Sequence, residues 1–579
     1  MCGIAGFLGK KAILNTMTGI KSLEYRGYDS SGIAYIDNSK VKIIKEKGKV
    51  ENLEKDIDYN IDSNISIAHT RWATHGIPNK TNAHPHNVGK ITLVHNGIIE
   101  NYEEIKDKLN YKPKSETDSE ILAALINDLY IKLKDMKKVL SKLKKIVKGT
   151  YAVLIINEDY KDTLFATRND SPLIVGKKNN EIMFASDIPA ILHFTNHYYL
   201  LDNYDIVIAT KNKIEFLDNN LKAIVKKGFI YDEKADSITK AGYEHFMLKE
   251  INEEPEVFKK IISKYIKDNK IVDMFDISKY NEIEIVACGS AYHAGLIGKY
   301  YIENIAGIKV TVTYASEYRY SKHFFNTNNL VIVISQSGET ADTLAALKIA
   351  KESGVDTLAI VNVYKSSIAR LAKYVVYTES GIEIAVATTK AYLAQCLVLL
   401  LLALNKSQDE NMIKELFKIP NILTKYINKD YKQVAKIVAK YDHIFYLGRE
   451  LDYYLAMEGS LKLKEISYIH SEAYPAGELK HGTISLMDKN TLVIAVVTLD
   501  NIKDKTISNL KEIASRNAKI VTITVDADFK SDYKIQIEEN ILSPFATIIP
   551  MQLLAYEVAK IKGCDIDKPR NLAKSVTVE

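Results

Sequence analysis

Cysteine, tryptophan and proline are scarce in this chain, and long apolar stretches are absent. Its 579 residues include four cysteines, eleven prolines and one tryptophan. The longest apolar run, Leu397 to Leu404, is too short to span a bilayer, so it predicts a buried helix and no membrane partner. The N-terminus has no basic-then-apolar signal region. Neither a disulfide framework nor a zinc site is indicated by the scattered cysteines, which are Cys2, Cys288, Cys396 and Cys564. We therefore expect a cytoplasmic protein.

An excess of one charge sign is missing as well. The formal net charge is only +5, and no block of basic residues stands out, so a nucleic-acid partner is not expected. With 46% hydrophobic and 26% charged residues, the composition is that of an ordinary globular protein. The length is enough for three or four domains.

A hydroxyl-rich loop lies between a predicted strand and a predicted helix. Residues 330–334 are apolar and predict a buried parallel strand, and the amphipathic run from Ala341 to Gly354 predicts a helix. The loop has no lysine, which favours a phosphate monoester over a nucleoside triphosphate. A helix start and neutral donors suit an anion, although an ordinary strand–helix turn is the alternative. The candidate phosphate-binding residues are Ser335, Gln336, Ser337 and Thr340.

The chain begins Met-Cys-Gly-Ile-Ala-Gly-Phe. Removal of Met1 would make Cys2 the first residue, and its α-amino group, with a reference pKa of about 7.7–8.0, could then take the thiol proton. A cysteine after the start codon can also arise by chance. Four further segments accompany this one: LEYRGYDSSG at 23–32, HTRWATHG at 69–76, HNGIIEN at 95–101 and SETDSE at 115–120.

In this order, the segments resemble the N-terminal-nucleophile glutamine amidotransferases. The resemblance implies a sandwich of two sheets flanked by helices, with Cys2 attacking the glutamine side-chain amide. It implies an oxyanion hole made by Asn96 and the backbone N–H of Gly97. Arg71 would bind the substrate carboxylate, Asp118 would bind the ammonium group, and Trp72 would border an ammonia passage. The glutamine site would consist of Arg71, Trp72, Thr74, His75 and Asp118.

The local pattern of this first domain agrees with such a sandwich. Helical runs are predicted near 98–109 and 119–130. Short strands are predicted near 4–8, 31–37, 65–68, 91–95, 151–156, 163–167 and 182–185. No metal site is expected, because the region's histidines lie in separate predicted loops and strands without an i,i+4 helical pair. They are His69, His75, His84, His86 and His95.

An internal repeat follows a junction that we place around residues 236–256, where Pro255 and a polar run interrupt the pattern. Both halves of the repeat alternate strand and helix, which predicts two parallel α/β/α sandwiches. In the second half, Asp500 and its neighbours replace the phosphate loop, so one phosphate site per chain is expected. The predicted parts are a glutaminase domain at 1–238, a linker at 239–256, sugar-isomerase domains at 257–425 and 426–565, and a catalytic tail at 566–579.

The whole chain resembles the glutamine–fructose-6-phosphate aminotransferases (isomerising), through MCGI, HTRWATHG, SQSGETADT, residues 458–482 and the terminal PRNLAKSVTVE. The resemblance implies that glutamine and fructose 6-phosphate are the substrates, and that no cofactor takes part. Glu465 would be the proton shuttle, Lys462 would support it, and His481 would open the sugar ring. Lys574 in the tail would form an imine with the open-chain sugar. Ser290 and Val386 would contact the sugar, and a homodimer is expected.

Glu458, Lys462 and Glu465 share one face of a predicted helix, which by itself is more typical of a salt-bridged surface. Two departures from the family pattern concern the sugar site: Ala291 stands where a serine is common, and Thr388 stands where serine is usual. Two alternatives remain, namely a phosphosugar sensor without catalytic activity, and another phosphosugar amidotransferase or deglycase.

Overall fold

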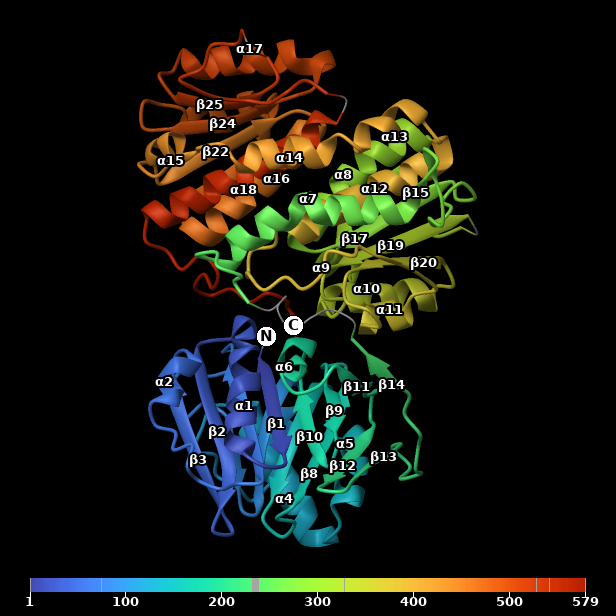
Figure 1. Ribbon diagram of the computed structural model, residues 1–579, viewed down its shortest axis with the longest axis vertical. Coiled ribbons are helices and arrows are strands. Elements are labelled where there is room, and N and C mark those ends of the chain that lie inside the picture. Colours follow the sequence, from blue (N-terminus) through green and yellow to red (C-terminus); the bar gives the residue numbers. More distant parts are fainter. Residues whose placement is uncertain are drawn as a thin grey trace. The chain divides into compact units, whose positions relative to one another are not determined.

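The computed structural model describes residues 2–73, 75–231, 239–326, 328–526, 528–540 and 542–577. It divides into two compact units. The first consists of Met1–Ile238 together with Ala573–Glu579, and the second is Thr239–Leu572. Figure 1 shows the elements of both, and each unit is described by itself.

The first unit is built on two antiparallel sheets. The eight-stranded sheet has the order β14 (Gly228–Ile230), β11 (His197–Leu200), β9 (Ile174–Lys178), β10 (Glu181–Ala185), β1 (Gly3–Leu8), β4 (Ile65–Arg71), β2 (Ser30–Asp37) and β3 (Lys40–Lys47). The six-stranded sheet has the order β13 (Lys213–Leu217), β12 (Ile206–Thr210), β8 (Thr163–Asn169), β7 (Gly149–Asn157), β6 (Ile91–Ile99) and β5 (His86–Val88).

The inner faces of these sheets form one core, in which Ile4 and Ile67 of the first sheet meet Leu154 and Val207 of the second. Helices cover the outer faces. One set lies with the eight-stranded sheet and comprises α1 (Ala12–Lys21), α2 (Val50–Glu54) and α6 (Ile188–Leu192); the other comprises α3 (Tyr102–Lys108), α4 (Asp118–Leu133) and α5 (Met136–Ile146). The expected two-sheet sandwich with flanking helices is confirmed.

The predicted strands of the first unit are all present, but the helix predicted at 98–109 begins later. Ile98 and Ile99 continue β6, because they pair with Thr150 and Gly149 of β7, and α3 starts only at Tyr102. The ladder hydrogen bonds therefore override the helical pattern at these positions.

The second unit contains two five-stranded parallel sheets of the same topology, so the predicted repeat is confirmed. The first sheet has the order β18 (Lys309–Tyr314), β17 (Glu282–Ala287), β19 (Asn329–Ser335), β20 (Asp356–Val361) and β21 (Tyr374–Tyr377). The second has the order β23 (His470–Pro475), β22 (His443–Gly448), β24 (Leu492–Val497), β25 (Lys519–Thr524) and β26 (Tyr533–Gln536).

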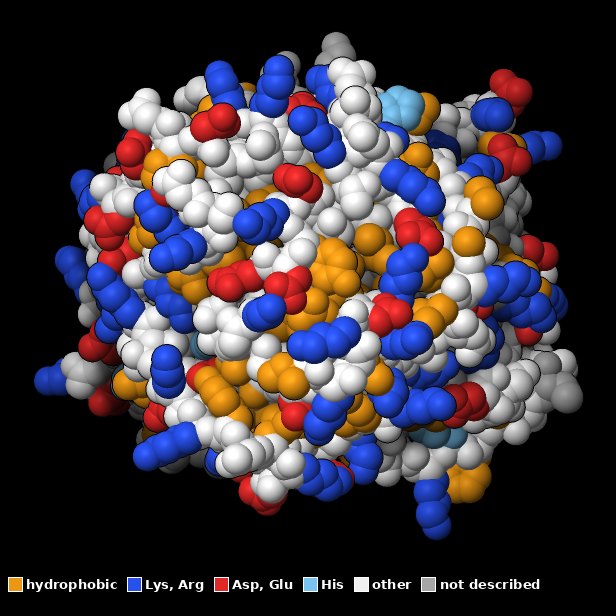
Figure 2. Space-filling model, turned by 90° about the horizontal axis from the view of Figure 1, so that it is seen from below, with side chains coloured by type: hydrophobic (Ala, Val, Ile, Leu, Met, Phe, Trp, Pro, Cys, Tyr) orange, Lys and Arg blue, Asp and Glu red, His pale blue; other side chains and the backbone are white. Residues whose placement is uncertain are grey.

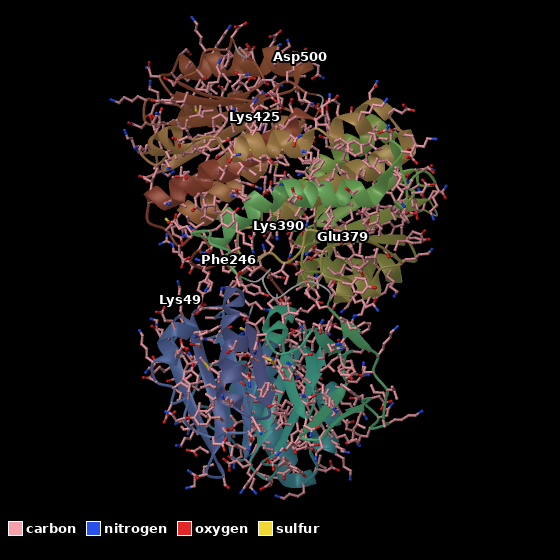
Figure 3. All side chains as sticks on the ribbon, viewed as in Figure 1. Lys49, Phe246, Glu379, Lys390, Lys425 and Asp500 are labelled. Carbon is pink, nitrogen blue, oxygen red and sulfur yellow. The ribbon has the colours of Figure 1, made fainter. Side chains whose placement is uncertain are left out.

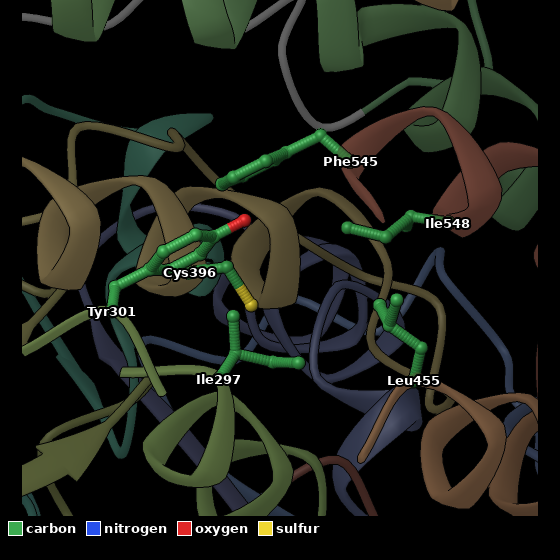
Figure 4. A pocket seen from close by; sticks show the side chains of 6 residues that line it. All are labelled: Ile297, Tyr301, Cys396, Leu455, Phe545 and Ile548. Atoms are coloured by element: carbon green, nitrogen blue, oxygen red, sulfur yellow. The ribbon is translucent and has the colours of Figure 1, made fainter. Parts of the chain in front are cut away.

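Long helices join the two halves into one hydrophobic core. They are α7 (Phe246–Tyr265), α8 (Gly289–Tyr301), α12 (Lys390–Ser407), α14 (Ile419–Ile427), α16 (Leu451–Ser467) and α18 (Ser543–Ile561). The outer faces and connections carry α9 (Ala315–Tyr318), α10 (Ala341–Glu352), α11 (Ser367–Leu371), α13 (Glu410–Leu416), α15 (Lys432–Val438), α17 (Lys503–Ala514), β15 (Ile266–Lys267) and β16 (Lys270–Ile271). In Figure 4, a small apolar pocket between helices of this core is lined by Ile297, Tyr301, Cys396, Leu455, Phe545 and Ile548.

Helix α12 carries the apolar run noted in the sequence. Within the described ranges it is the one helix that is long and apolar enough to cross a membrane, and 83% of that stretch is buried inside the fold. The burial agrees with the predicted core helix.

Pro255 lies inside α7, so the prediction of a junction at this residue is wrong. Residues 246–256 of the expected linker belong to that helix. Pro255 is itself buried, as are Ile251 and Phe258 of the same helix, so tertiary packing holds the helix together through the missing backbone hydrogen bond. Figure 3 labels Phe246 at the start of α7 and Lys390 at the start of α12.

Charged side chains of both signs are interspersed on the face shown in Figure 2, with apolar side chains between them. This mixture agrees with the near-balanced composition of the chain.

Candidate active sites

Cys2 immediately precedes β1, and its thiol is held by the backbone of Trp72. The Trp72 N–H donates to Cys2 Sγ at 3.4 Å, and the thiol donates to the Trp72 carbonyl oxygen at 3.6 Å. Burial raises the pKa of the Cys2 thiol, while the contact with Trp72 and the positive charges of Arg71 and Arg26 partly oppose that shift. The thiol therefore needs a base to become a nucleophile near neutral pH.

Asn96 and Gly97 stand beside this cysteine on β6. The Asn96 amide nitrogen donates to the Cys2 carbonyl oxygen at 2.9 Å. Gly97 has a φ of +132°, and a Cβ there would overlap the carbonyl oxygen of Thr150, so only glycine fits. The two residues predicted to form an oxyanion hole are thus brought next to the predicted nucleophile.

Arg71 interacts electrostatically with both the Cys2 thiol and the opposite charge of Asp118. The Arg71 guanidinium uses Nη2 to donate to the carbonyl oxygens of His75 and Gly76, the latter at 3.2 Å. Its Nη1 is buried and has no hydrogen-bond partner among the residues that the structure describes. Asp118 opens α4 and accepts the Ile99 N–H at 2.9 Å. An amino acid's carboxylate and ammonium groups would complement these two charges.

Of the other residues predicted for the glutamine site, the structure describes Trp72 and His75. His75 packs its ring edge-on against Tyr102, with centroids 5.5 Å apart. Trp72 is half-buried, and its backbone rather than its ring makes the contact with the thiol. Thr74 lies outside the described residues.

Three of the histidines are closer together than the sequence suggested. The rings of His69 and His84 stack with centroids 4.0 Å apart, and those of His84 and His86 lie 4.7 Å apart. Burial lowers the pKa of each, to about 3 for His69, so the cluster is neutral. Within the described ranges, no group of three or more His, Cys, Asp or Glu side chains is arranged to hold a metal ion.

In the second unit, the predicted phosphate loop connects β19 to α10. Ser335 Oγ accepts the Gly338 N–H at 3.0 Å and lies 2.8 Å from Thr340 Oγ1, while Ser337 Oγ accepts the Glu339 N–H at 3.2 Å. Gly338 has a φ of +64°, and a side chain there would overlap Ser366. The loop joins a strand to a helix N-terminus, as the sequence predicted. It is a tight turn in which the Ser335 and Ser337 hydroxyls accept backbone N–H groups.

The Gln336 backbone contributes to this turn, since its carbonyl oxygen accepts the Asn362 N–H at 3.1 Å. This bond ties the loop to the end of β20, the neighbouring strand of the same sheet.

The corresponding loop of the second repeat is filled by the protein itself. Asp452 is buried at the start of α16, and its carboxylate accepts the N–H groups of Thr498 and Leu499 at 2.8 and 3.3 Å, together with the Thr498 hydroxyl. Burial raises the pKa of Asp452 to about 6. The sequence analysis expected Asp500 to be the acid that keeps phosphate out of this loop. Asp500 instead pairs with Lys503 at 2.6 Å. An internal carboxylate thus takes the backbone donors that a phosphate would need.

Glu458, Lys462 and Glu465 of α16 form a chain of ion pairs in which Glu458 and Lys462 are buried and Glu465 is partly exposed, rather than a surface one. Lys462 Nζ lies 2.6 Å from a Glu465 oxygen and 3.4 Å from a Glu458 oxygen, and its side chain is 1% exposed. Glu458 also accepts from Ser290 Oγ at 2.8 Å and from His293 Nδ1 at 2.7 Å. This network joins α8 of the first repeat to α16 of the second.

The electrostatics of that network keep Glu458 and Lys462 ionised. Burial alone would raise the pKa of Glu458, but Lys462 and His293 outweigh it, so the pKa falls below the ordinary value. Burial would likewise lower the pKa of Lys462, but the two glutamates raise it. His293 was missed by the sequence analysis; its position three residues after Ser290 on one helix face was the signal that could have identified it.

The full chain is similar to curated proteins along its entire length. Residues 69–193 match the family model of the glutamine amidotransferase domain, and residues 276–405 and 437–562 match that of the SIS domain. The glutamine–fructose-6-phosphate aminotransferase (isomerizing) of Clostridium tetani is 46% identical over 612 aligned residues, covering 100% of both chains. The protein of the same name from Aquifex aeolicus is 41% identical over 597 residues, again with 100% of both chains covered.

The chain belongs to this aminotransferase family. Among solved structures, the C-terminal domain of glucosamine-fructose-6-phosphate aminotransferase from Francisella tularensis has 39% sequence identity and a TM-score of 0.55. It covers 57% of this chain, and 99% of that domain is matched. The predicted fold class, an amidotransferase sandwich followed by two sugar-isomerase domains, is therefore confirmed.

The other residues that the family resemblance assigned to the sugar site have mixed surroundings. The Val386 N–H donates to the carbonyl oxygen of Asp567 at 3.0 Å. The Thr388 hydroxyl, a departure from the family pattern, donates to Glu383. His481 is exposed in a short 3-10 helix at Glu478–His481, and no hydrogen bond described in the structure joins it to Lys462 or Glu465.

The tail residue Lys574 is half-buried and belongs to a segment, Ala573–Glu579, that groups with the first unit. The last two residues of the tail lie outside the described residues. The role of Lys574 in imine formation stays a prediction.

Proposed function

We propose that the protein transfers ammonia from L-glutamine to fructose 6-phosphate and isomerises the sugar, giving glucosamine 6-phosphate and glutamate. One observation carries the proposal. A single chain combines the Cys2, Asn96 and Gly97 arrangement with the Ser335–Thr340 turn and the buried Lys462–Glu465 pair. The full-length similarity to the family supports the same reaction.

In the first half-reaction, Cys2 is the nucleophile. After removal of Met1, its free α-amino group takes the thiol proton, and the thiolate attacks the side-chain amide carbon of glutamine. The Asn96 amide and the Gly97 N–H hold the oxyanion of the tetrahedral intermediate, and ammonia leaves. Water then cleaves the thioester to release glutamate. Arg71 binds the α-carboxylate of glutamine, and Asp118 binds its α-ammonium group.

In the second half-reaction, hydroxyl and backbone donors of the Ser335–Thr340 turn hold the sugar phosphate. His481 moves the proton that opens the ring, and Lys574 forms an imine with the C2 carbonyl group. Ammonia from the first half-reaction displaces the lysine, and Glu465 carries a proton from C1 to C2, which turns the ketose imine into the aminoaldose. Lys462 keeps Glu465 oriented through their 2.6 Å contact.

The assembly and the compartment belong to the proposal too. We expect a homodimer in the cytoplasm. Two exposed aromatic side chains that follow α9 in the chain, Tyr320 at 80% and Phe324 at 85% exposure, would be available for such a contact.

The experiment is an assay of the purified full chain with glutamine and fructose 6-phosphate, in which the products are identified by mass spectrometry and NMR. We expect glucosamine 6-phosphate and glutamate in equal amounts, and neither from a Cys2→Ala variant supplied with glutamine. A phosphosugar sensor would bind fructose 6-phosphate and form no product. Another phosphosugar amidotransferase would consume glutamine only with a different sugar phosphate, which a panel of ketose and aldose phosphates detects.

A further inference from the structure

His69 makes a hydrogen bond to a residue of the proposed oxyanion hole. It lies on β4 and is completely buried. Its Nε2 atom is 3.0 Å from the His95 carbonyl oxygen and also 3.0 Å from Asn96 Oδ1. Neither the sequence motif nor the proposed reaction assigns a role to His69.

The two acceptors determine where the hydrogens lie. A backbone carbonyl oxygen can only accept, so the His69 Nε2 atom must carry a hydrogen. The atom of Asn96 that faces this N–H must then be the oxygen, which turns the amide nitrogen to the opposite side. That nitrogen donates to the Cys2 carbonyl oxygen at 2.9 Å, and its second hydrogen is left for another acceptor.

The surroundings keep this arrangement from reversing. Burial lowers the pKa of His69 to about 3, so the imidazole is neutral and has a single N–H. The other ring nitrogen, Nδ1, has no hydrogen-bond partner among the described residues, and the ring stacks on His84. Burying an unprotonated Nδ1 without a partner costs less free energy than burying an unsatisfied N–H donor. This comparison again places the hydrogen on Nε2.

We propose that His69 is a positioning residue for glutamine hydrolysis: its Nε2–H sets which way round the Asn96 amide stands, and so keeps an N–H, rather than a carbonyl oxygen, directed at the developing oxyanion. This inference rests on the proposed function. Without the bond, the amide loses one of the two contacts that fix its orientation, the other being its donation to the Cys2 carbonyl oxygen. The turned-over form is then more populated, and its oxygen repels the negative charge that forms during the attack by Cys2. Loss of one oxyanion-hole donor lowers kcat by about 10²- to 10³-fold.

Two variants of His69 separate positioning from bulk structural effects. In His69→Gln, the side-chain amide nitrogen can occupy the place of Nε2 and still donate to Asn96. In His69→Asn, the same functional group is too short to reach it. We expect His69→Asn to lose about 10²-fold or more in the kcat of glutamine hydrolysis with little change in KM, because Arg71 and Asp118 are untouched. His69→Gln should stay within about tenfold of the parent, since it retains the donor.

A second reaction tests whether His69→Asn still folds around a competent thiol. Alkylation of Cys2 by iodoacetamide is a direct displacement that forms no oxyanion, and peptide mass spectrometry distinguishes it from alkylation of the other cysteines. We expect equal alkylation rates for the parent and both variants. A rate for His69→Asn that falls in proportion to its kcat would overturn the proposal, because the defect would then lie in the thiol or the fold.

The tautomer can be tested without any activity. In ¹⁵N NMR spectra of the full chain with labelled histidine, assigned by comparison with His69→Gln, the His69 signals should report a protonated Nε2 and an unprotonated Nδ1 at pH 7. A protonated Nδ1, or equal kcat values for His69→Asn and the parent, would refute the inference. A parent enzyme with no glutamine hydrolysis at all would instead refute the proposed function.

Discussion

Removing two hydroxyl groups from the turn between β19 and α10 should weaken the binding of fructose 6-phosphate steeply. Ser335 Oγ accepts the Gly338 N–H and can donate its hydrogen to Thr340 Oγ1, 2.8 Å away, which frees the Thr340 hydrogen for an anion. Each neutral hydrogen bond to a charged group contributes about 1.5–3 kcal/mol. The double variant Ser337→Ala with Thr340→Val should therefore raise the dissociation constant by about 10²- to 10⁴-fold.

Isothermal titration calorimetry of the full chain with fructose 6-phosphate measures this change directly. Ser353→Ala is a matched control, because Ser353 is exposed at the opposite end of α10 and its hydroxyl donates to the Ile349 carbonyl oxygen of the same helix, at 2.9 Å. We expect the control to bind normally and the glutaminase rate of the double variant, measured without sugar, to be unchanged. A double variant whose dissociation constant changes by less than about threefold would mean that the phosphate binds elsewhere.

The remaining predictions concern both units. Cys2→Ala should abolish glutamine hydrolysis and leave calorimetric binding of fructose 6-phosphate intact; intact-mass analysis that finds Met1 retained on fully active enzyme would contradict the α-amine base. Gly97→Ala should lower glutaminase kcat by about 10²-fold or more, because a side chain overlaps the Thr150 backbone, whereas normal turnover would remove Gly97 from the oxyanion hole. Lys462→Met should lower the free energy of unfolding by about 3–5 kcal/mol, because it leaves the Glu458 charge buried without its cation. A loss below about 1 kcal/mol in denaturant titrations would show that the residues of the network are not coupled. Lys574→Arg should keep glutamine hydrolysis but lose synthesis of glucosamine 6-phosphate, since guanidinium is not a nucleophile. Borohydride trapping of the parent protein with fructose 6-phosphate should label the peptide after Arg570. Normal synthesis by the variant would exclude an imine at this lysine.

Much of the fold could be predicted because its elements have strong local patterns. The apolar strands of the second unit, such as Leu492–Val497, are buried in parallel sheets on both faces and therefore stand out as continuous apolar runs. Pro255 misled the prediction, since a proline in a buried helix is held by packing that a local pattern does not reveal. Ile98 and Ile99 misled it as well, because their extended conformation depends on β7, about fifty residues away in the chain.

The candidate sites could be predicted residue by residue where a motif is short and contiguous. Cys2, Asn96 and the Ser335–Thr340 turn belong to such motifs. Residues that reach the second repeat's loop and the α16 network from elsewhere in the chain were not predicted. Asp452 fills the second loop from the start of α16, and His293 reaches Glu458 from another helix; both depend on long-range packing that sequence spacing does not encode.

An isotope experiment tests the central claim, that one chain carries both half-reactions. The purified protein is supplied with glutamine labelled with ¹⁵N in the side-chain amide, fructose 6-phosphate and an excess of unlabelled ammonium. If ammonia released at Cys2 is passed to the sugar bound in the second unit, the glucosamine 6-phosphate formed will carry ¹⁵N on C2, and Cys2→Ala will form none of the labelled product. Product that carries mainly ¹⁴N in the parent protein, or labelled glutamine that is hydrolysed without any aminosugar, would contradict the account.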